Sequence, residues 1–205
     1  MTTLVLDFDG TVTQTDLLDT VAREFGDPTV YAEVEEGLDT GRITLRECIT
    51  REYEPVTAPL DEMVEWVLAH ARIRAGFREL VEAAQDRGWR VVILSSGFEE
   101  LIRPVLDSIG VEVELLANSV DVTPEGWRVH WREETVCAVC GEQCKRAALP
   151  GEGEIVYVGD GISDRCAALA SDRVFATRGL AEYLTERGTP YERFEDFFQV
   201  LERLG

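Results

Sequence analysis

The chain has 205 residues, of which 45% are hydrophobic, and this size suits one compact domain or a domain with a sizeable insertion. Asp and Glu number 40 against 20 Lys and Arg, and the formal net charge of −20 disfavours partners such as nucleic acid and anionic membranes. No segment is apolar for long enough to span a bilayer, and the N-terminus lacks the basic region of a signal peptide, so we expect a cytoplasmic protein.

The first predicted element is a buried strand over residues 4–9. Its apolar run ends in Asp7 and Asp9, and Gly10 follows at once. Side chains alternate along a strand, so both carboxylates should point to the same side. Carboxylates held that close repel each other unless a cation or a shared proton lies between them. The alternative interpretation is a polar turn without a chemical role.

A helical region is predicted next, from residue 16 to residue 74. Apolar residues recur at helical spacing over residues 17–25 and 63–71, and Pro and Gly residues separate these segments. No convincing strand pattern occurs in this region. We therefore predict a small helical insertion between residues 1–15 and residues 75–205.

Helices and strands alternate from Phe77 to the end of the chain. The expected helices cover residues 77–84, 99–109 and 191–204, and the expected strands cover residues 90–94, 113–117, 154–158 and 174–176. Residues 120–122 and 127–131 flank a Pro-Glu-Gly turn, which predicts a β-hairpin insertion. Such alternation predicts an α/β fold with a parallel sheet and helices on both faces.

Three of the predicted strands end in polar turns that contain glycine. In a doubly wound sheet such turns meet at one edge, where ligands bind. The side chains collected there would be Asp7, Asp9, Ser95, Asp160 and Asp164. Four carboxylates without a histidine favour a hard divalent cation, most plausibly Mg²⁺, over zinc at this edge.

Lys145 is the only lysine of the chain, and it lies shortly before the strand that ends near Asp160. A compact ammonium is not interchangeable with a guanidinium where it must approach a phosphoryl oxygen. Lys145 would balance the carboxylates and stabilise a phosphoryl group during transfer. The alternative is a surface lysine that survived by chance.

Taken together, these motifs resemble the haloacid dehalogenase (HAD) superfamily of phosphatases. Residues 7–11, Ser95, Lys145 and residues 159–164 follow the order of the four superfamily motifs, and the helical region is similar to the C1-type cap. The resemblance implies a Rossmann-like core of residues 1–15 and 75–205 with a cap of residues 16–74. It also implies a Mg²⁺-dependent phosphomonoester hydrolase that works through an aspartyl-phosphate.

The resemblance implies a role for each matched residue. Asp7 would be the nucleophile, Asp9 would protonate the leaving group and then activate water, and Lys145 would bridge Asp7 and the phosphoryl oxygens. The implied metal-binding residues are Asp7, Asp9 through its carbonyl, Asp160 and Asp164. The implied substrate-binding residues are Ser95, Ser96, Gly97, Thr11, Asp16 and Arg51.

Within the superfamily, residues 7–13, 73–80 and 95–98 resemble the phosphoserine phosphatase-like branch. They are most similar to the methionine-salvage group that acts on 2-hydroxy-3-keto-5-methylthiopentenyl-1-phosphate. Phosphoserine phosphatase matches less well, because Asp16 replaces its ammonium-binding glutamate and Thr50 stands about where its cap arginine would be. The alternatives are a phosphoserine- or phosphoethanolamine-type phosphatase, a phosphotransferase and a non-catalytic binding protein. We expect a small phosphorylated metabolite as substrate and a monomer or homodimer.

The five cysteines argue against a disulfide framework, because their number is odd and the expected compartment is reducing. Three of them have the spacing of metal ligands: Cys137, Cys140 and Cys144. A structural zinc site usually needs four ligands, and His130 or a distant cysteine could supply the fourth. The alternative is a set of reduced thiols that support the loop before Lys145. Cys48 and Cys166 are predicted core residues.

Overall fold

The computed structural model describes residues 1–205, and its centre is a sheet of seven strands. In chain order these are β1 (Thr2–Leu6), β2 (Arg90–Phe98), β3 (Glu114–Thr123), β4 (Gly126–His130), β5 (Glu154–Gly159), β6 (Arg173–Ala176) and β7 (Glu192–Arg193). Their order across the sheet is β4-β3-β2-β1-β5-β6-β7. Only β3 and β4 pair in antiparallel fashion, as the predicted hairpin. The mostly parallel α/β sheet confirms the expected fold class.

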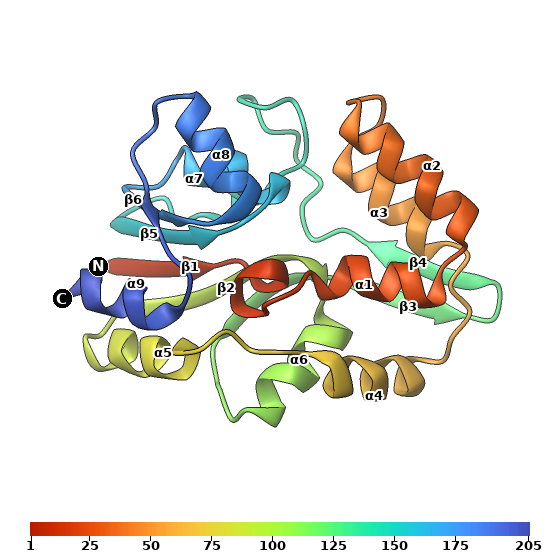
Figure 1. The fold of residues 1–205 in the computed structure, drawn as a ribbon, viewed down its shortest axis with the longest axis horizontal. Coiled ribbons are helices and arrows are strands. Elements are labelled where there is room, and N and C mark those ends of the chain that lie inside the picture. Colours follow the sequence, from red (N-terminus) through yellow and green to blue (C-terminus); the bar gives the residue numbers. More distant parts are fainter.

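Helices cover both faces of this sheet (Figure 1). One face carries α5 (Phe77–Asp86), α6 (Glu99–Ser108) and α9 (Phe197–Leu204), and the other carries α7 (Arg165–Ala168) and α8 (Arg178–Glu186). Alternation along β1 explains the two layers, because Leu4 and Leu6 belong to the larger apolar core whereas Val5 belongs to the smaller one. The central strands are therefore buried on both sides, as expected of a parallel sheet.

Four helices occupy the predicted helical region: α1 (Leu17–Phe25), α2 (Pro28–Asp39), α3 (Leu45–Tyr53) and α4 (Leu60–His70). Polar residues cap the first three of them: Asp16 accepts a hydrogen bond from Asp19 N, Asp27 accepts from Thr29 N, and Thr44 forms a capping box with Glu47. Figure 1 shows α2 and α3 paired at one end of the molecule, whereas α4 packs against α6 beneath the sheet. The boundary of a separate cap at residue 74 remains a prediction.

The end of the first strand differs from its predicted position. β1 ends at Leu6 rather than Asp9, and residues 8–12 form a tight turn in which Thr13 N donates to Phe8 O at 3.0 Å. Gly10 has a φ of 74°, which glycine adopts without strain. Because this turn follows the strand, Asp9 does not continue the alternation of β1. The direction of its side chain therefore cannot be predicted from strand alternation.

Other boundaries also differ from the predicted ones. β2 continues through Phe98, with a shift of register between Leu94 and Phe98, so the expected polar turn is part of a bulged strand. Residues 113–117 and 120–122 belong to one long strand, because β3 pairs first with β2 and then with β4. The C-terminal helix is shorter than predicted, and β7 had no sequence signal.

No helix in this structure combines the length and the apolar character that a transmembrane span requires.

Candidate active site

The ends of β1 and β5 bring one lysine and two carboxylates together below the surface. Lys145 Nζ forms an ion pair with Asp7 Oδ1 and a second one, at 2.7 Å, with Asp164 Oδ1. Lys145 is 3% exposed, Asp7 is 4% exposed and Asp164 is fully buried. Low local polarity strengthens these attractions. Removing Lys145 would leave two buried carboxylates without compensation, whereas removing the charge of Asp7 would leave Lys145 paired with Asp164.

Asp164 is held by four hydrogen-bond donors, two on each carboxylate oxygen. Oδ1 accepts from Lys145 Nζ and from Tyr157 OH, each at 2.7 Å. Oδ2 accepts from the backbone N–H groups of Asp160 and Gly161 at 2.9 and 3.0 Å. These four bonds use the acceptor capacity of a carboxylate. Asp164 is therefore suited to fixing Lys145 rather than to direct contact with another ligand.

Asp160 lies beside this group and is held from two sides. Thr11 Oγ1 donates to Oδ1 at 3.0 Å, and Arg178 Nη1 lies 3.3 Å from Oδ2. Gly10 is required at this contact, because a Cβ there would stand 2.3 Å from Asp160 Oδ2. The tight turn after β1 and the end of β5 thus fit together only with glycine at position 10.

Three of these side chains could hold a metal ion. Asp7, Asp160 and Asp164 each offer a carboxylate oxygen, and the three oxygens lie within 4.8 Å of one another. Oxygen ligands without nitrogen or sulfur suit Mg²⁺. The hydrogen bonds on Asp164 leave Asp7 and Asp160 as the side chains best placed for direct contact. The Asp9 side chain is outside this group, so Asp9 could contribute only its backbone carbonyl.

The side chain of Asp9 instead faces β2 and the start of α1. Ser95 Oγ donates to Asp9 Oδ2 at 3.2 Å, and Leu18 N donates to Oδ1 at 3.3 Å. Gly97 N in turn donates to Ser95 Oγ at 2.8 Å, which fixes the hydroxyl. Burial, reinforced by Asp16, raises the pKa of Asp9 to about 7. A carboxyl group with this pKa can exchange a proton near neutral pH.

Burial and neighbouring charges shift the pKa values of Asp7 and Lys145 in different ways. Burial raises the pKa of Asp7, the Asp164 carboxylate raises it further, and the Lys145 ammonium opposes both. For Lys145, burial alone would lower the pKa, but Asp164 and Asp7 outweigh burial and raise it. The lysine therefore stays cationic at neutral pH, as electrostatic stabilisation of an anionic group requires.

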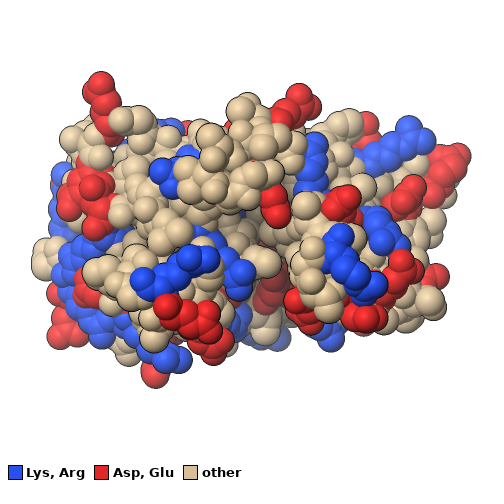
Figure 2. Space-filling model, turned by 90° about the horizontal axis from the view of Figure 1, so that it is seen from above, with Lys and Arg blue, Asp and Glu red and all other residues tan.

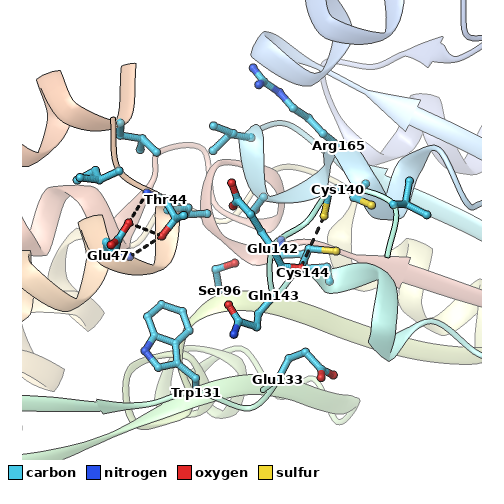
Figure 3. Close-up of a pocket in the computed structure, with 18 of the residues that line it drawn as sticks. Thr44, Glu47, Ser96, Trp131, Glu133, Cys140, Glu142, Gln143, Cys144 and Arg165 are labelled. Atoms are coloured by element: carbon cyan, nitrogen blue, oxygen red, sulfur yellow. Dashed lines mark hydrogen bonds between the residues drawn. The ribbon is translucent and has the colours of Figure 1, made fainter. Parts of the chain in front are cut away.

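The carboxylates open into a cavity of about 400 Å³, which we call the catalytic cavity. Asp7, Asp9 and Asp160 line one side of it, and residues of α1, α2 and α3 line the other. A second cavity of about 630 Å³, the side cavity, borders Ser96 and Lys145 and reaches residues 131–133 and 139–145 (Figure 3). From above, the surface is hollowed between the end that carries α2 and α3 and the rest of the molecule (Figure 2).

The remaining predicted substrate residues divide into two groups. Ser96, Gly97 and Asp16 line the catalytic cavity. Thr11 is fully buried and supports Asp160, so its hydroxyl does not face the cavity. Arg51 is not brought to the site, because it lies on the outer face of α3 and pairs with Glu33 at 2.8 Å. Arg51 is thus absent from the cavity lining, and its predicted role in substrate binding has no support from this geometry.

Several supporting residues were not predicted. Arg74 donates to the carbonyl oxygens of Gly10 and Thr11 and fixes the tight turn. Arg178 pairs with Asp160 from α8, and Asn118 of β3 donates to Ser96 O at 2.7 Å. Tyr157 had a signal, because a tyrosine in an otherwise aliphatic strand needs a partner for its hydroxyl. Arg178 and Asn118 come from distant segments and had no comparable local signal.

The fold thus places several carboxylates and one buried lysine at the carboxyl ends of parallel strands, where open α/β sheets bind their ligands. A family model described as haloacid dehalogenase-like hydrolase matches residues 4–169. The chain belongs to this family.

Curated relatives agree with this assignment. A protein of Geobacillus thermodenitrificans named 2-hydroxy-3-keto-5-methylthiopentenyl-1-phosphate phosphatase is 28% identical over 98% of this chain and 94% of its own length. A protein of Exiguobacterium sibiricum with the same name is 26% identical over 98% of this chain and 95% of its own. The expectation of a phosphatase of this family is thus confirmed.

Solved structures share the fold. A substrate-bound phosphoserine phosphatase complex aligns with a TM-score of 0.74 and 18% identity, over 99% of this chain and 98% of its own. Phosphoserine phosphatase from T. onnurineus aligns with a TM-score of 0.71 and 20% identity, over 98% of this chain and 92% of its own. At these identities the likeness establishes the fold only.

Proposed function

We propose that the chain is a Mg²⁺-dependent phosphomonoester hydrolase in which Asp7 becomes transiently phosphorylated. The observation that carries the proposal is the buried Lys145 ammonium between Asp7 and Asp164, with Asp160 and Asp9 beside it. Asp7, Asp160 and the Asp9 carbonyl would hold Mg²⁺. When bound, the ion would neutralise charge on the phosphoryl oxygens.

The reaction would use the two aspartates in turn. Asp7 attacks phosphorus while the ester P–O bond breaks, and Asp9 gives its proton to the leaving oxygen. Asp9 then takes a proton from water, whose oxygen attacks phosphorus and releases inorganic phosphate from Asp7. Lys145 offsets the negative charge of Asp7 and the phosphoryl group throughout. Ser95, held by Gly97 N, orients Asp9.

The pKa of Asp9 predicts a pH dependence that varies with the leaving group. Asp9 must be protonated to act as an acid, so phosphorylation by an alkyl phosphate should slow as the pH rises through about 7. An aryl phosphate with a good leaving group needs little protonation and should show a weaker decline. Single-turnover phosphorylation rates for both substrates between pH 5.5 and about 8.5 would measure the difference.

The variant Asp9→Asn sharpens this test. The amide cannot donate the proton, so the single-turnover rate of phosphorylation should fall roughly 100-fold more with the alkyl phosphate than with the aryl phosphate. Ser95→Ala is the matched variant, because it removes a partner of Asp9 and keeps the carboxyl group. Equal losses on both substrates in Asp9→Asn would remove Asp9 from the role of general acid.

The catalytic cavity indicates which substrates fit. We propose that residues 16–74 act as a cap, because α1–α3 supply the wall opposite Asp7. This wall holds no free cation, since Arg23 is paired with Asp19 and Arg51 points away. A free carboxylate on the substrate would therefore meet no unpaired cation on this wall, and the remaining cation of the cavity, Arg178, is paired with Asp160. The apolar lining residues, which suit a neutral chain, are Leu18, Leu38, Leu45 and Ile49.

This lining supports a substrate of the methionine-salvage type as the first candidate. In such a phosphate ester the part of the molecule beyond the phosphate is an uncharged chain that carries a thioether. An amino-alcohol phosphate is the second, because Asp16, Glu35 and Glu52 line the same wall and could receive an ammonium group. Burial, with Glu35, raises the pKa of Glu52 to about 8, so Glu52 would be largely uncharged at pH 7. This favours the neutral substrate.

A panel of phosphate esters tests the proposal. We expect the highest kcat/KM with 2-hydroxy-3-keto-5-methylthiopentenyl-1-phosphate, a lower value with phosphoethanolamine and the lowest with phosphoserine. Chelation of divalent cations should abolish turnover, and Mg²⁺ should restore it. A preference for phosphoserine would contradict the reading of the cavity wall, and an absence of turnover with every ester would contradict the hydrolase.

A further inference from the structure

Four of the five cysteines meet in one place outside the carboxylate site. Sulfur atoms of Cys137, Cys140, Cys144 and Cys166 all lie within 4.8 Å of one another. None of them forms a disulfide. The fourth ligand that the spacing left open is thus present, and it is Cys166 rather than His130. His130 instead pairs with Asp121 at 2.8 Å.

One sulfur–sulfur distance equals the edge of a tetrahedral zinc site, and all four sulfur atoms lie close enough to share one ion. Cys137 Sγ and Cys166 Sγ are 3.8 Å apart. With Zn–S bonds of about 2.3 Å, the edge of a regular tetrahedron of sulfur atoms is about 3.8 Å. Four thiolates with tetrahedral spacing form a closed coordination shell, which is characteristic of structural rather than catalytic zinc.

The backbone before Lys145 is folded to present these thiols. Gly141 N donates to Cys137 O and Cys137 N donates to Glu142 O, both at 2.9 Å, so the segment doubles back on itself. Val139 N donates to Cys137 Sγ at 3.4 Å, a bond that favours a thiolate. Figure 3 shows Cys140 and Cys144 on the wall of the side cavity, with Glu142 beside Cys140. No regular helix or strand holds residues 131–144 in place.

Two of the four cysteines are close in sequence to the residues of the buried ion pair. Cys144 immediately precedes Lys145, and Cys166 lies two residues after Asp164. These two positions flank the contact between Lys145 Nζ and Asp164 Oδ1. An ion bound to all four thiolates would therefore join the segment that carries Lys145 to the start of α7.

We propose that Cys137, Cys140, Cys144 and Cys166 bind one structural Zn²⁺ that fixes the Lys145 segment against α7. The deprotonated thiols would supply four negative charges and the ion two positive ones, and each cysteine would release its proton on binding. This site is separate from the Mg²⁺ site, which contains only oxygen donors. It does not depend on the substrate or on catalysis by Asp7.

Metal analysis of the native protein is the first test. After purification under reducing conditions without chelators, we expect inductively coupled plasma mass spectrometry to find about one zinc ion per chain. Replacing zinc with Co²⁺ should give the intense visible and near-ultraviolet absorption of tetrahedral cobalt thiolate. A chain that contains no zinc and takes up none on addition, or that contains iron instead, would overturn the proposal.

Single substitutions assign the ligands. Cys166→Ser should lose most of the zinc, and Cys48→Ser is the matched control because Cys48 is buried elsewhere, near Glu35. Cys140→Ser should also lose zinc, whereas Cys140→His should retain it, because three cysteines and one histidine form an established zinc shell. Retention of full zinc by Cys166→Ser would contradict the four-thiolate site. Zinc loss by Cys48→Ser equal to that of Cys166→Ser would do the same.

The link to Lys145 has its own readout. Release of zinc by an organomercurial should lower kcat at saturating Mg²⁺, and excess thiol with zinc should restore it, whereas excess thiol with additional Mg²⁺ should not. Zinc release without any change in kcat would show that the ion does not position Lys145. The zinc content itself stays measurable even if no substrate is turned over, so failure of the proposed hydrolase and failure of the zinc site are distinguishable.

Discussion

The substitution Asp7→Asn is expected to reduce kcat roughly 10⁴-fold or more, the scale seen when a covalent nucleophile is removed. The amide keeps the size of the side chain but cannot attack phosphorus as a carboxylate does. The fold should persist, because the substitution also removes the repulsion between Asp7 and Asp164 that raises the pKa of Asp7. Turnover of an aryl phosphate with Mg²⁺ and the thermal unfolding curve would measure the two effects.

The control for this prediction is Asp107→Asn. Asp107 is exposed on α6 and its side chain forms no hydrogen bond or ion pair, so kcat should change less than about two-fold. Activity of Asp7→Asn above about one tenth of the native value would contradict the assignment of the nucleophile. A loss of activity accompanied by unfolding would be resolved with Asp7→Glu, which keeps the charge but displaces the attacking oxygen.

Lys145→Met is expected to have the second-largest effect, on both stability and rate. It leaves Asp7 and Asp164 buried without their cation, and breaking a buried pair in this way costs about 3–5 kcal/mol. The rate should fall on the order of 100- to 1,000-fold, because the charge of the phosphoryl group is no longer offset. Urea unfolding and aryl phosphate turnover would measure the two losses.

The stability loss should depend on pH. Without the ammonium, the pKa of Asp7, which burial and Asp164 already raise, would rise further. A carboxyl group whose pKa is higher in the folded state binds a proton more readily when folded, so the deficit should grow as the pH rises and shrink as it falls. Urea midpoints at pH 5 and pH 8 would therefore differ more in Lys145→Met than in the native protein.

Arg146→Met is the matched control for Lys145→Met. Arg146 follows Lys145 directly and forms no ion pair in the structure, so the substitution removes the same charge without disturbing the carboxylates. Its stability and kcat should stay near the native values. If the two variants were equally stable at pH 8, Lys145 would not be the counter-ion of the buried aspartates.

Local sequence patterns predict much of this fold. The alternation of apolar strands and amphipathic helices is strong enough to give the parallel sheet, the helical region after β1 and the β3–β4 hairpin. Motif spacing likewise placed Asp7, Asp160, Asp164 and Lys145 at one edge, because the carboxyl ends of neighbouring parallel strands meet there. Lys145 was conspicuous as the only lysine.

Features set by tertiary contacts were not predictable in the same way. The continuation of β2 beyond Leu94 depends on pairing with β3, and the tight turn that reorients Asp9 is held by Arg74 from the far end of the helical region. The distance of Arg51 from the catalytic cavity depends on which face of α3 meets that cavity, and the sequence pattern of residues 16–74 does not determine this face. Cys166 is buried, as predicted, but only the fold brings it close to Cys137.

Trapping the phosphorylated chain would test the central claim most directly. Asp9→Asn should form the aspartyl-phosphate from an aryl phosphate in the presence of Mg²⁺ but hydrolyse it slowly, since water is no longer activated. After an acid quench and proteolysis, mass spectrometry should find one phosphoryl group on the peptide that contains Asp7, and none in a variant that also carries Asp7→Asn. A phosphoryl group on a different residue, or product released in a single turnover without any phosphorylated chain, would contradict nucleophilic catalysis by Asp7.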